Sequence, residues 1–378
     1  MFRLDADPAL LRETEEQRQL RSVLRDFLAQ TCEPEEVRKQ ADSPRGHDEV
    51  LWHRLADEIG VHGLAVPEEY GGAGGTFAEL AVAMEETGRV LSPAPLLSTV
   101  VLAGHTLLDS GDRQACARWL PGIADGSLTA TVAGFPHPGA VTAEEGAGGW
   151  MLRGEADFVP DGEGADLLLV AARAPDGERL FACEPDPATC ERTARRVLDP
   201  TRRQALVRFR GAPAEPVGEP GRAPDTVAGV LDATRAALAA EHVGGSAHAL
   251  DAVLAHVVRR TQFGRPIGSF QAVKHRLADL LVEVEGARSA AAYAAACVAG
   301  RRTDQLPVAA SAAAVACTAA YRLATAEYVQ LHGGIGFTWE HPAHLYLRRA
   351  RADEALFGTG DDHRLRLAGL LGLTGRTG

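Results

Sequence analysis

Apolar residues in the first third of the chain recur at helical spacing. In the earliest run they fall at i, i+3, i+4, i+7 and i+8, which lines one face of a helix: Leu20, Val23, Leu24, Phe27 and Leu28. A second amphipathic run, which ends at Gly60, has its apolar positions at Leu51, Trp52, Leu55 and Ile59. Thr76 and Glu79 form a capping-box pattern after the glycine-rich turn 71–75, so a third helix is predicted to begin there. The first 125 residues are therefore predicted to be helical.

The pattern changes near Leu128. Short β-prone runs, separated by Gly, Pro and Asp turns, lie at 128–132, 150–159, 166–172 and 205–210. In the last run Val207 and Phe209 alternate with two arginines, which is the period of a half-buried strand. A Pro- and Gly-rich stretch, 211–224, is predicted to be a linker, and Ala-rich helical sequence follows from about Thr226 nearly to the end.

This order predicts a mostly α, α+β fold with three domains. They are an N-terminal helical domain (1–126), a middle β-barrel-like domain (127–224) and a C-terminal helical bundle (225–378). Packing against sister subunits is a natural way to cover the faces of an Ala-rich bundle, so an oligomer is expected.

Composition narrows the class of protein. Hydrophobic residues make up 46% and charged residues 24% of the 378 residues, as in a folded globular protein. The net charge of −12 argues against a nucleic-acid partner, because phosphate binding needs clustered Lys and Arg. The start lacks an apolar leader and no run of 18 apolar residues follows, so no membrane partner and a cytoplasmic location are expected. The six cysteines show no zinc-site spacing, so no metal is predicted.

Two C-terminal segments carry the candidate chemistry. The segment 260–279 reads as the end of a helix, a Gly/Pro turn and an amphipathic helix, and taken alone it could be a charged interhelical turn. Its Arg260 could clamp a phosphate while Phe263 offers an apolar surface to a planar ring. The segment 330–337 is Gln-Leu-His-Gly-Gly-Ile-Gly-Phe, which could be a plain glycine stop or a close backbone approach to a pyrophosphate.

Taken together and in this order, the two segments resemble the acyl-CoA dehydrogenase signatures RxxFGxPIGxFQxxxHxLAD and QxxGGxGF. The resemblance extends over nearly the whole chain, including 51–56, 63–72 and 199–202. It implies FAD as cofactor, an acyl-CoA substrate, a tetramer and an electron-transfer protein as acceptor. It also assigns eight cofactor-binding residues, several of which would reach the adenine and pyrophosphate of a neighbouring chain's FAD: Arg260, Gln262, Phe263, Ile267, Gln330, Gly333, Gly334 and Thr359.

The resemblance breaks at the catalytic base. In the family a glutamate takes the α-proton of the thioester while the β-hydride passes to the flavin, and here Phe357 stands at that position. The alternative glutamate position on the first long C-terminal helix is occupied by Thr234. Arg235 beside it is a candidate substrate-binding residue, and Glu241, two turns further along, is a weak candidate for a relocated base.

The β-domain also departs from the family pattern. The stretches that match the flavin- and thioester-contacting loop and strand are 132–139 and 158–161. Pro160 has neither a hydroxyl nor an amide hydrogen to offer a flavin, although Phe158 could stack on a ring.

These departures are similar to those of the glutamate-lacking subunit of actinobacterial heterotetrameric (α2β2) acyl-CoA dehydrogenases of steroid side-chain breakdown. The chain is therefore expected to complete the FAD site of a glutamate-bearing second subunit. Two alternatives stay open. One is a self-sufficient, homotetrameric flavoenzyme with another base or a carrier-bound acyl substrate, and the other is a non-catalytic binding protein. The sequence does not indicate which acyl group is used.

Overall fold

The computed structural model describes residues 12–136 and 139–373, and their contacts group the chain into two compact units. The helical unit combines the chain up to Val37 with Ala81–Ser92 and the chain from Arg235 onward. The mixed unit combines Arg38–Leu80 with Pro93–Thr234, so α2, α4 and α7 contain residues of both units. The predicted division into three domains stays a prediction.

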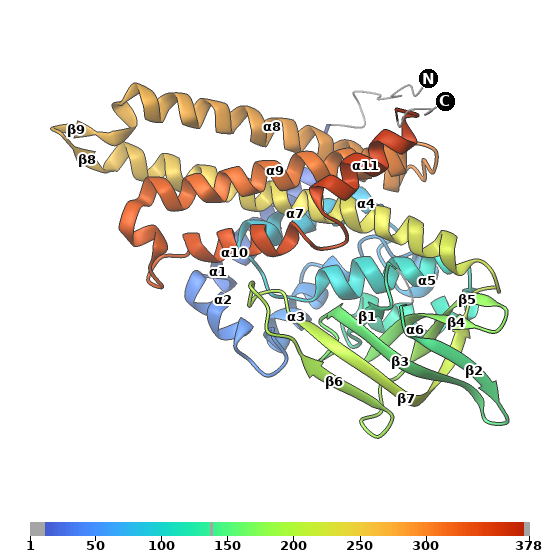
Figure 1. Ribbon diagram of the computed structural model, residues 1–378. Helices are drawn as coiled ribbons and strands as arrows, with labels where there is room; N and C mark the ends of the chain where they lie inside the picture. Colours follow the sequence, from blue (N-terminus) through green and yellow to red (C-terminus); the bar gives the residue numbers. More distant parts are fainter. Residues whose placement is uncertain (1–11, 137–138, 374–378) are drawn as a thin grey trace. The chain divides into compact units, whose positions relative to one another are not determined.

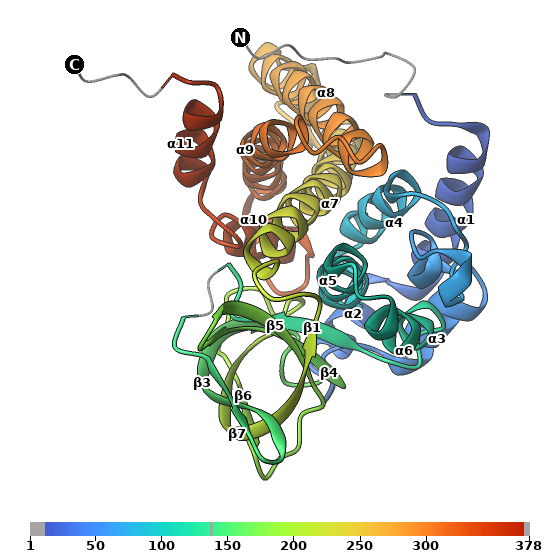
Figure 2. The ribbon, with the colours of Figure 1, turned by 90° about the vertical axis from the view of Figure 1, so that its right-hand side faces the viewer.

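The helical unit is built on long helices. Its elements are α1 (Glu15–Thr31), the end of α4 (Phe77–Arg89), α7 (Ala223–Arg259), the strands β8 (Thr261–Gln262) and β9 (Arg265–Pro266), α8 (Gln271–Ala299), α9 (Leu306–His332), α10 (Ala343–Asp353) and α11 (Gly360–Leu370). Helix α9 packs against α8, α10 and α11. Figures 1 and 2 show α7 alongside α8 and α9, and Figure 1 shows the β8–β9 hairpin at the end where α7 stops and α8 begins.

Local sequence explains these helices. Thr14 and Gln17 form the capping box that starts α1, whose inward face carries the fully buried Leu24 and Leu28. Thr76 and Glu79 bond each other at the start of α4, as their spacing predicted. Gly244 on α7 lies so close to α4 that a Cβ there would stand 1.8 Å from the carbonyl oxygen of Glu85. Only glycine permits that approach.

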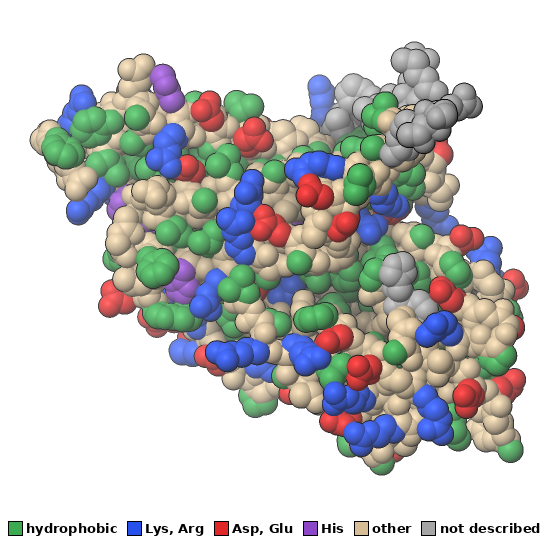
Figure 3. All heavy atoms as spheres, viewed as in Figure 1, with side chains coloured by type: hydrophobic (Ala, Val, Ile, Leu, Met, Phe, Trp, Pro, Cys, Tyr) green, Lys and Arg blue, Asp and Glu red, His purple; other side chains and the backbone are tan. Residues whose placement is uncertain are grey.

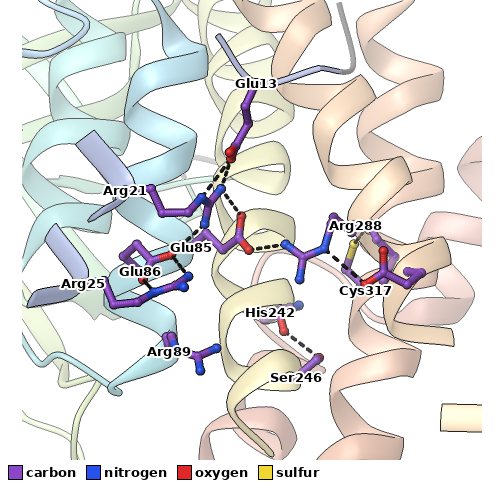
Figure 4. Close-up of polar contacts among 12 residues, drawn as sticks. Glu13, Arg21, Arg25, Glu85, Glu86, Arg89, His242, Ser246, Arg288 and Cys317 are labelled. Atoms are coloured by element: carbon purple, nitrogen blue, oxygen red, sulfur yellow. Dashed lines mark hydrogen bonds and ion pairs between the residues drawn. The ribbon is translucent and has the colours of Figure 1, made fainter. Parts of the chain in front are cut away.

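Ion pairs tie α1, α4 and α8 together. Arg21 bonds Glu86 at 2.6 Å and Glu85 at 2.9 Å, and Arg25 bonds Glu86 at 2.7 Å. Glu85 also accepts from Arg288 of α8 (Figure 4). Because Glu86 is only 1% exposed, its charge is tolerated only with both arginines in place.

The mixed unit joins short helices to a seven-stranded sheet. Its helices are α2 (Pro34–Ala41), α3 (Glu49–Asp57), α5 (Gly104–Ser110) and α6 (Arg113–Ala124), with a π-helical turn at Leu97–Ala103. Its strands are β1 (Ala130–Ala133), β2 (Thr142–Gly146), β3 (Gly149–Pro160), β4 (Leu167–Ala174), β5 (Gly177–Cys183), β6 (Cys190–Ala194) and β7 (Gln204–Val217). Pairings run from β4 through β2, β3, β7 and β5 back to β4, which closes the sheet on itself. Figure 2 shows the strands curling around their interior.

The fold class is confirmed, and one boundary is wrong. The predicted linker begins at residue 211, but β7 continues through Val217, where Pro213 pairs with Met151 and Pro216 with Phe181. Both prolines are exposed, whereas Ala212 and Val217 are buried. The strand therefore places apolar side chains on its inward face although its composition is typical of a turn.

In the described part of the chain, one helical stretch, Leu306–Phe337, has the length and apolarity of a membrane span. Half of its apolar window is buried within the protein, as is usual for the central helix of a bundle.

Candidate functional site

A two-residue hairpin connects α7 to α8. Phe263 and Gly264, its two central residues, both have positive φ (+52° and +75°), the backbone of the tightest hairpin turns. The amide of Ile267 donates to the carbonyl of Arg260 at 2.8 Å and closes the base of the hairpin. Phe263, a bulky residue in a conformation that favours glycine, is 90% exposed. The chain thus holds a large ring out into solvent on a strained turn.

The polar side chains at this end are also exposed. Arg260, Gln262 and Gln330 have no side-chain hydrogen bond or ion pair with any other described residue. Figure 3 shows hydrophobic and Lys or Arg side chains gathered where the hairpin projects. A guanidinium and two amides without partners in their own chain are available to an external anion or heterocycle.

Glycines end α9 beside this hairpin. Helix α9 stops at His332, and Gly333 takes a positive φ of 65°. A Cβ at Gly333 or Gly334 would meet no atom of the chain within 4 Å, so the backbone there faces open space. A pyrophosphate could approach this backbone closely.

Two imidazoles in contact bring the two segments together. The rings of His256, on the last turn of α7, and His332, at the end of α9, have centroids 4.1 Å apart. Residues 260–267 and 330–334 therefore lie at the same end of the helical unit, which we call the hairpin end. The structure thus brings together seven of the eight predicted cofactor residues.

The eighth, Thr359, lies elsewhere in the helical unit. It is the N-cap of α11, where its hydroxyl donates to Asp362 at 2.7 Å and its oxygen accepts from the Asp362 amide. The bonds that the Thr359 hydroxyl and backbone amide donate to the Asp362 carboxylate lower its pKa. Thr359 therefore has a structural role in its own chain in addition to the predicted one.

Phe357 is held in a left-handed conformation just before this cap. Its φ is +58°, and Gly358 follows at +118°. The guanidinium of Arg235, on α7, donates to the Phe357 carbonyl at 3.3 Å. The predicted substrate-binding Arg235 thus contacts the backbone at the base position.

The carboxylates near Phe357 all have partners within the chain. We call residues 353–362 the base segment. Its four acids bond as follows: Asp353 to His242, Glu354 to Arg351 and Arg322, Asp361 to Arg364, and Asp362 to Thr359. Each of these carboxylates therefore has a structural contact within the chain.

Glu241 lies in the interior of the bundle. It is 5% exposed and accepts from Arg349 of α10, which is 2% exposed. A Cβ on Gly88 of α4 would stand 2.7 Å from the Glu241 side chain, so α4 covers it as well. A carboxylate in a buried ion pair is committed to its partner, which favours a structural role over the predicted weak one as a base. Thr234 is fully buried and donates to the carbonyl of Val230.

The two stretches of the β-domain that differ from the family pattern, 132–139 and 158–161, lie in the mixed unit. Phe158 is 62% exposed at a φ of +54°, and the Pro160 carbonyl accepts from Thr131 at 2.6 Å. In the other departing stretch, 132–139, His137 and Pro138 lie outside the described residues.

Comparison with known proteins places the chain. Residues 14–127 match the acyl-CoA dehydrogenase N-terminal domain and residues 225–371 match its C-terminal domain. The chain belongs to the acyl-CoA dehydrogenase family. It is 37% identical over 344 residues to the acyl-CoA dehydrogenase IpdE2 of Mycobacterium tuberculosis, covering 90% of this chain and 93% of that protein.

Solved acyl-CoA dehydrogenases share the fold. A variant of the steroid ACAD Tcur3481-Tcur3483 is 32% identical with a TM-score of 0.84, over 95% of this chain and 98% of that one. A chain of the ChsE4-ChsE5 complex from Mycobacterium tuberculosis is 27% identical with a TM-score of 0.87, over 97% of this chain and 100% of that one. The chain is thus an acyl-CoA dehydrogenase, and FAD is the cofactor of its family.

The hairpin end fits part of FAD. Arg260 offers a cation to the pyrophosphate, Gly333 and Gly334 leave room for it, and Phe263 presents a ring face to a planar base. The histidine contact that joins the two segments was not predicted. Its only signal in the sequence is His332 within the second motif, because His256 lies 76 residues before it along the chain.

Proposed function

We propose that this acyl-CoA dehydrogenase chain is the base-lacking subunit of a heteromer, and that it completes the FAD site of a second subunit that carries the glutamate. One observation carries the proposal. The groups suited to FAD are held outward without partners in their own chain, while the base position holds Phe357 and every acid around it is engaged.

The division of labour follows from these side chains. When bound, FAD accepts the β-hydride of the acyl-CoA thioester, which becomes the trans-2-enoyl-CoA. Arg260 holds the pyrophosphate by charge-assisted hydrogen bonds, and Gln262 and Gln330 supply amides beside it. Phe357 cannot accept a proton, so the α-proton goes to the glutamate of the second subunit.

Relatives support the partner and the substrate class. The ChsE4-ChsE5 structure is a complex of two chains, and the Tcur3481-Tcur3483 structure is described as a steroid ACAD. Both likenesses support a second family member as partner and a steroid-derived acyl-CoA as substrate. An electron-transfer protein is the expected acceptor of the electrons.

The flavin content of the purified chain tests the proposal. We expect little FAD when the chain is expressed alone, and about one FAD for each pair of unlike chains after co-expression with a glutamate-bearing family member from the same genome. Replacing that partner's glutamate with glutamine should abolish dehydrogenation and leave FAD bound.

The alternatives give different results. One FAD per chain with turnover by the purified single chain would establish a self-sufficient enzyme. A chain that retains no flavin with any glutamate-bearing partner would be a binding protein.

A further inference from the structure

Three histidines meet where the two flavin segments join. His332 lies between the other two, with ring centroids 4.1 Å from His256 and 4.5 Å from His341. They come from three elements: the end of α7, the end of α9 and the loop before α10. Tyr328 packs its ring edge-on against His332 at 5.0 Å and His341 at 5.4 Å. We call these three imidazoles the histidine cluster.

Hydrogen bonds fix the neutral forms of two rings. The Nδ1 of His332 lies 2.9 Å from the carbonyl oxygen of Tyr328, and since a carbonyl only accepts, this nitrogen carries the proton. The Nδ1 of His341 accepts from the amide of Ala343 at 3.3 Å, so this nitrogen carries the lone pair. Ala343 is the first residue of α10, whose N-cap residue is Pro342, so the bond to His341 satisfies one of the amides left unpaired at the start of that helix.

Protonation would work against this arrangement in two ways. A proton on Nδ1 of His341 would break the bond from the Ala343 amide and place a cation at the positive end of α10. A proton on His332 would place a cation in contact with two other imidazoles. Both changes favour separation of the rings.

The charges around the cluster add to this effect. Burial first, then His332, Arg260 and Arg259, lower the pKa of His256, and burial lowers the pKa of His332. Of the acids on the surrounding elements, Asp251 pairs with Arg89 at 2.6 Å and Glu327 with Arg276 at 2.7 Å, while Glu340 is exposed. Further charged or titratable side chains at this end include His248, whose ring lies 5.9 Å from that of Tyr328 and whose lowered pKa depends in part on His341. The others are Arg265, Lys274, His275, Tyr328, His344, Tyr346 and Arg348.

We infer that His256, His332 and His341 are positioning residues that hold the two flavin segments together while neutral, and that protonation of the cluster releases them. Burial holds the pKa of His256 and of His332 below the ordinary value of 6.5 while the rings are in contact, and separation of the rings would relieve this effect. The open form therefore binds more protons as the pH falls through this range, and acid favours opening. The consequence for FAD rests on the proposed function, but the opening itself does not.

Amide hydrogen exchange of the full chain without FAD tests the inference. Between pH 7.5 and 5.5, corrected for the intrinsic effect of pH, exchange in 260–270 and 330–342 should rise about fivefold, on the scale where one unit of pKa difference is worth tenfold. His256→Phe keeps an aromatic ring and breaks no described side-chain hydrogen bond. His332→Asn keeps a donor for the Tyr328 carbonyl. Both variants should reduce the rise to less than about twofold.

His275→Phe is the matched control, because His275 is exposed on α8 outside the cluster and should leave the wild-type response intact. An equal rise in His256→Phe and wild type, or no rise in wild type, would overturn the inference. A second arm measures FAD retained by the co-expressed heteromer at both pH values. If the heteromer binds no FAD at pH 7.5, the proposed function fails while the exchange result stands.

Discussion

The hairpin end and the base segment differ in how their polar groups are used. At the hairpin end Arg260, Gln262 and Gln330 are exposed, and their side chains contact no other described residue by hydrogen bond or ion pair. In the base segment all four acids, Asp353 to Asp362, are bonded within the chain. Folding explains the second region, because these bonds join helices, cap them or link side chains one turn apart. It does not explain the first, whose exposed polar groups make no such bond and whose Phe263 ring contacts Phe270 only edge-on.

The difference teaches where to look for function in a chain with phenylalanine at the family's base position. Groups retained without an intramolecular partner, and held on a strained turn such as Phe263, indicate an external ligand. Groups that cap a helix or form an ion pair within the chain indicate a role in the stability of the fold. The following predictions test whether changes in the two regions affect stability or FAD binding.

The largest expected effect is at the buried Glu241–Arg349 pair. Glu241→Gln should lower the free energy of unfolding by about 3 kcal/mol, because Arg349 is left buried without its counter-charge. Glu283→Gln, at an exposed acid on α8, is the matched control and should cost almost nothing. Urea unfolding measures both. A stable Glu241→Gln protein whose heteromer has lost turnover would instead make Glu241 the base.

Arg260→Ala should have the opposite profile. We expect the heteromer to bind FAD more weakly by about 2 kcal/mol, roughly 30-fold, since a hydrogen-bonded charge to phosphate is lost. The unfolding midpoint of the chain should stay unchanged because Arg260 is exposed. Arg259→Ala, next to it, is the control, as that guanidinium donates to the Ala255 carbonyl of its own helix. Fluorescence titration with FAD measures the difference, and equal affinities in the two variants would contradict the assignment.

Acid should weaken the bundle through His248. This ring stacks on Tyr346 at 4.4 Å, and burial, assisted by Arg89 and His341 and opposed by Asp251, lowers its pKa to about 4. The unfolded chain therefore binds a proton near pH 6.5 that the folded chain refuses until about pH 4, so stability falls as the pH drops between these values.

By pH 5.5 the loss from this one group should be about 1.5 kcal/mol. His248→Phe keeps the stack and should remove that share of the pH dependence in urea unfolding at pH 7.5 and 5.5. His275→Phe should not. The same pH dependence in His248→Phe and wild type would show that this ring is not the source.

The sequence predicts the parts of this molecule that depend on short-range patterns. The helical face with Leu24 and Leu28 and the cap formed by Thr76 and Glu79 are confirmed in the structure. The linker prediction is wrong because Pro213 and Pro216 are typical of turns when only neighbouring residues are considered. In the structure the segment pairs with β3 and buries Ala212 and Val217, so it continues as a strand. Strands β2, β5 and β6 were missed because adjacent charged residues interrupt their apolar pattern, at 144–145, 178–179 and 191–192.

Contacts between residues that are distant in the sequence limit how much of the site can be predicted from the sequence. The motifs predict that Arg260 and Gln330 belong to one function, but nothing in the sequence pairs His256 with His332 or Glu241 with Arg349, which is 108 residues away. Phe357 was located by resemblance. Its left-handed backbone and the bond from Arg235 needed the structure.

The smallest expected effect concerns Thr359, which caps a helix in its own chain and is also a predicted flavin-binding residue. If its main role is the cap of α11, Thr359→Ala should cost about 1 kcal/mol of stability, and Thr359→Ser, which keeps the hydroxyl, should cost much less. If its hydroxyl also serves the flavin, the alanine variant should in addition weaken FAD binding by the heteromer, and serine should restore it. Because the Thr359 hydroxyl already donates to Asp362 at 2.7 Å, we expect the stability loss and only a minor change in affinity.

Asp362→Asn separates the two roles, since it weakens the same cap from its other side without altering the threonine. Equal losses of FAD affinity in Thr359→Ala and Asp362→Asn would show that the cap positions the loop, whereas a loss in Thr359→Ala alone would move Thr359 into the flavin site.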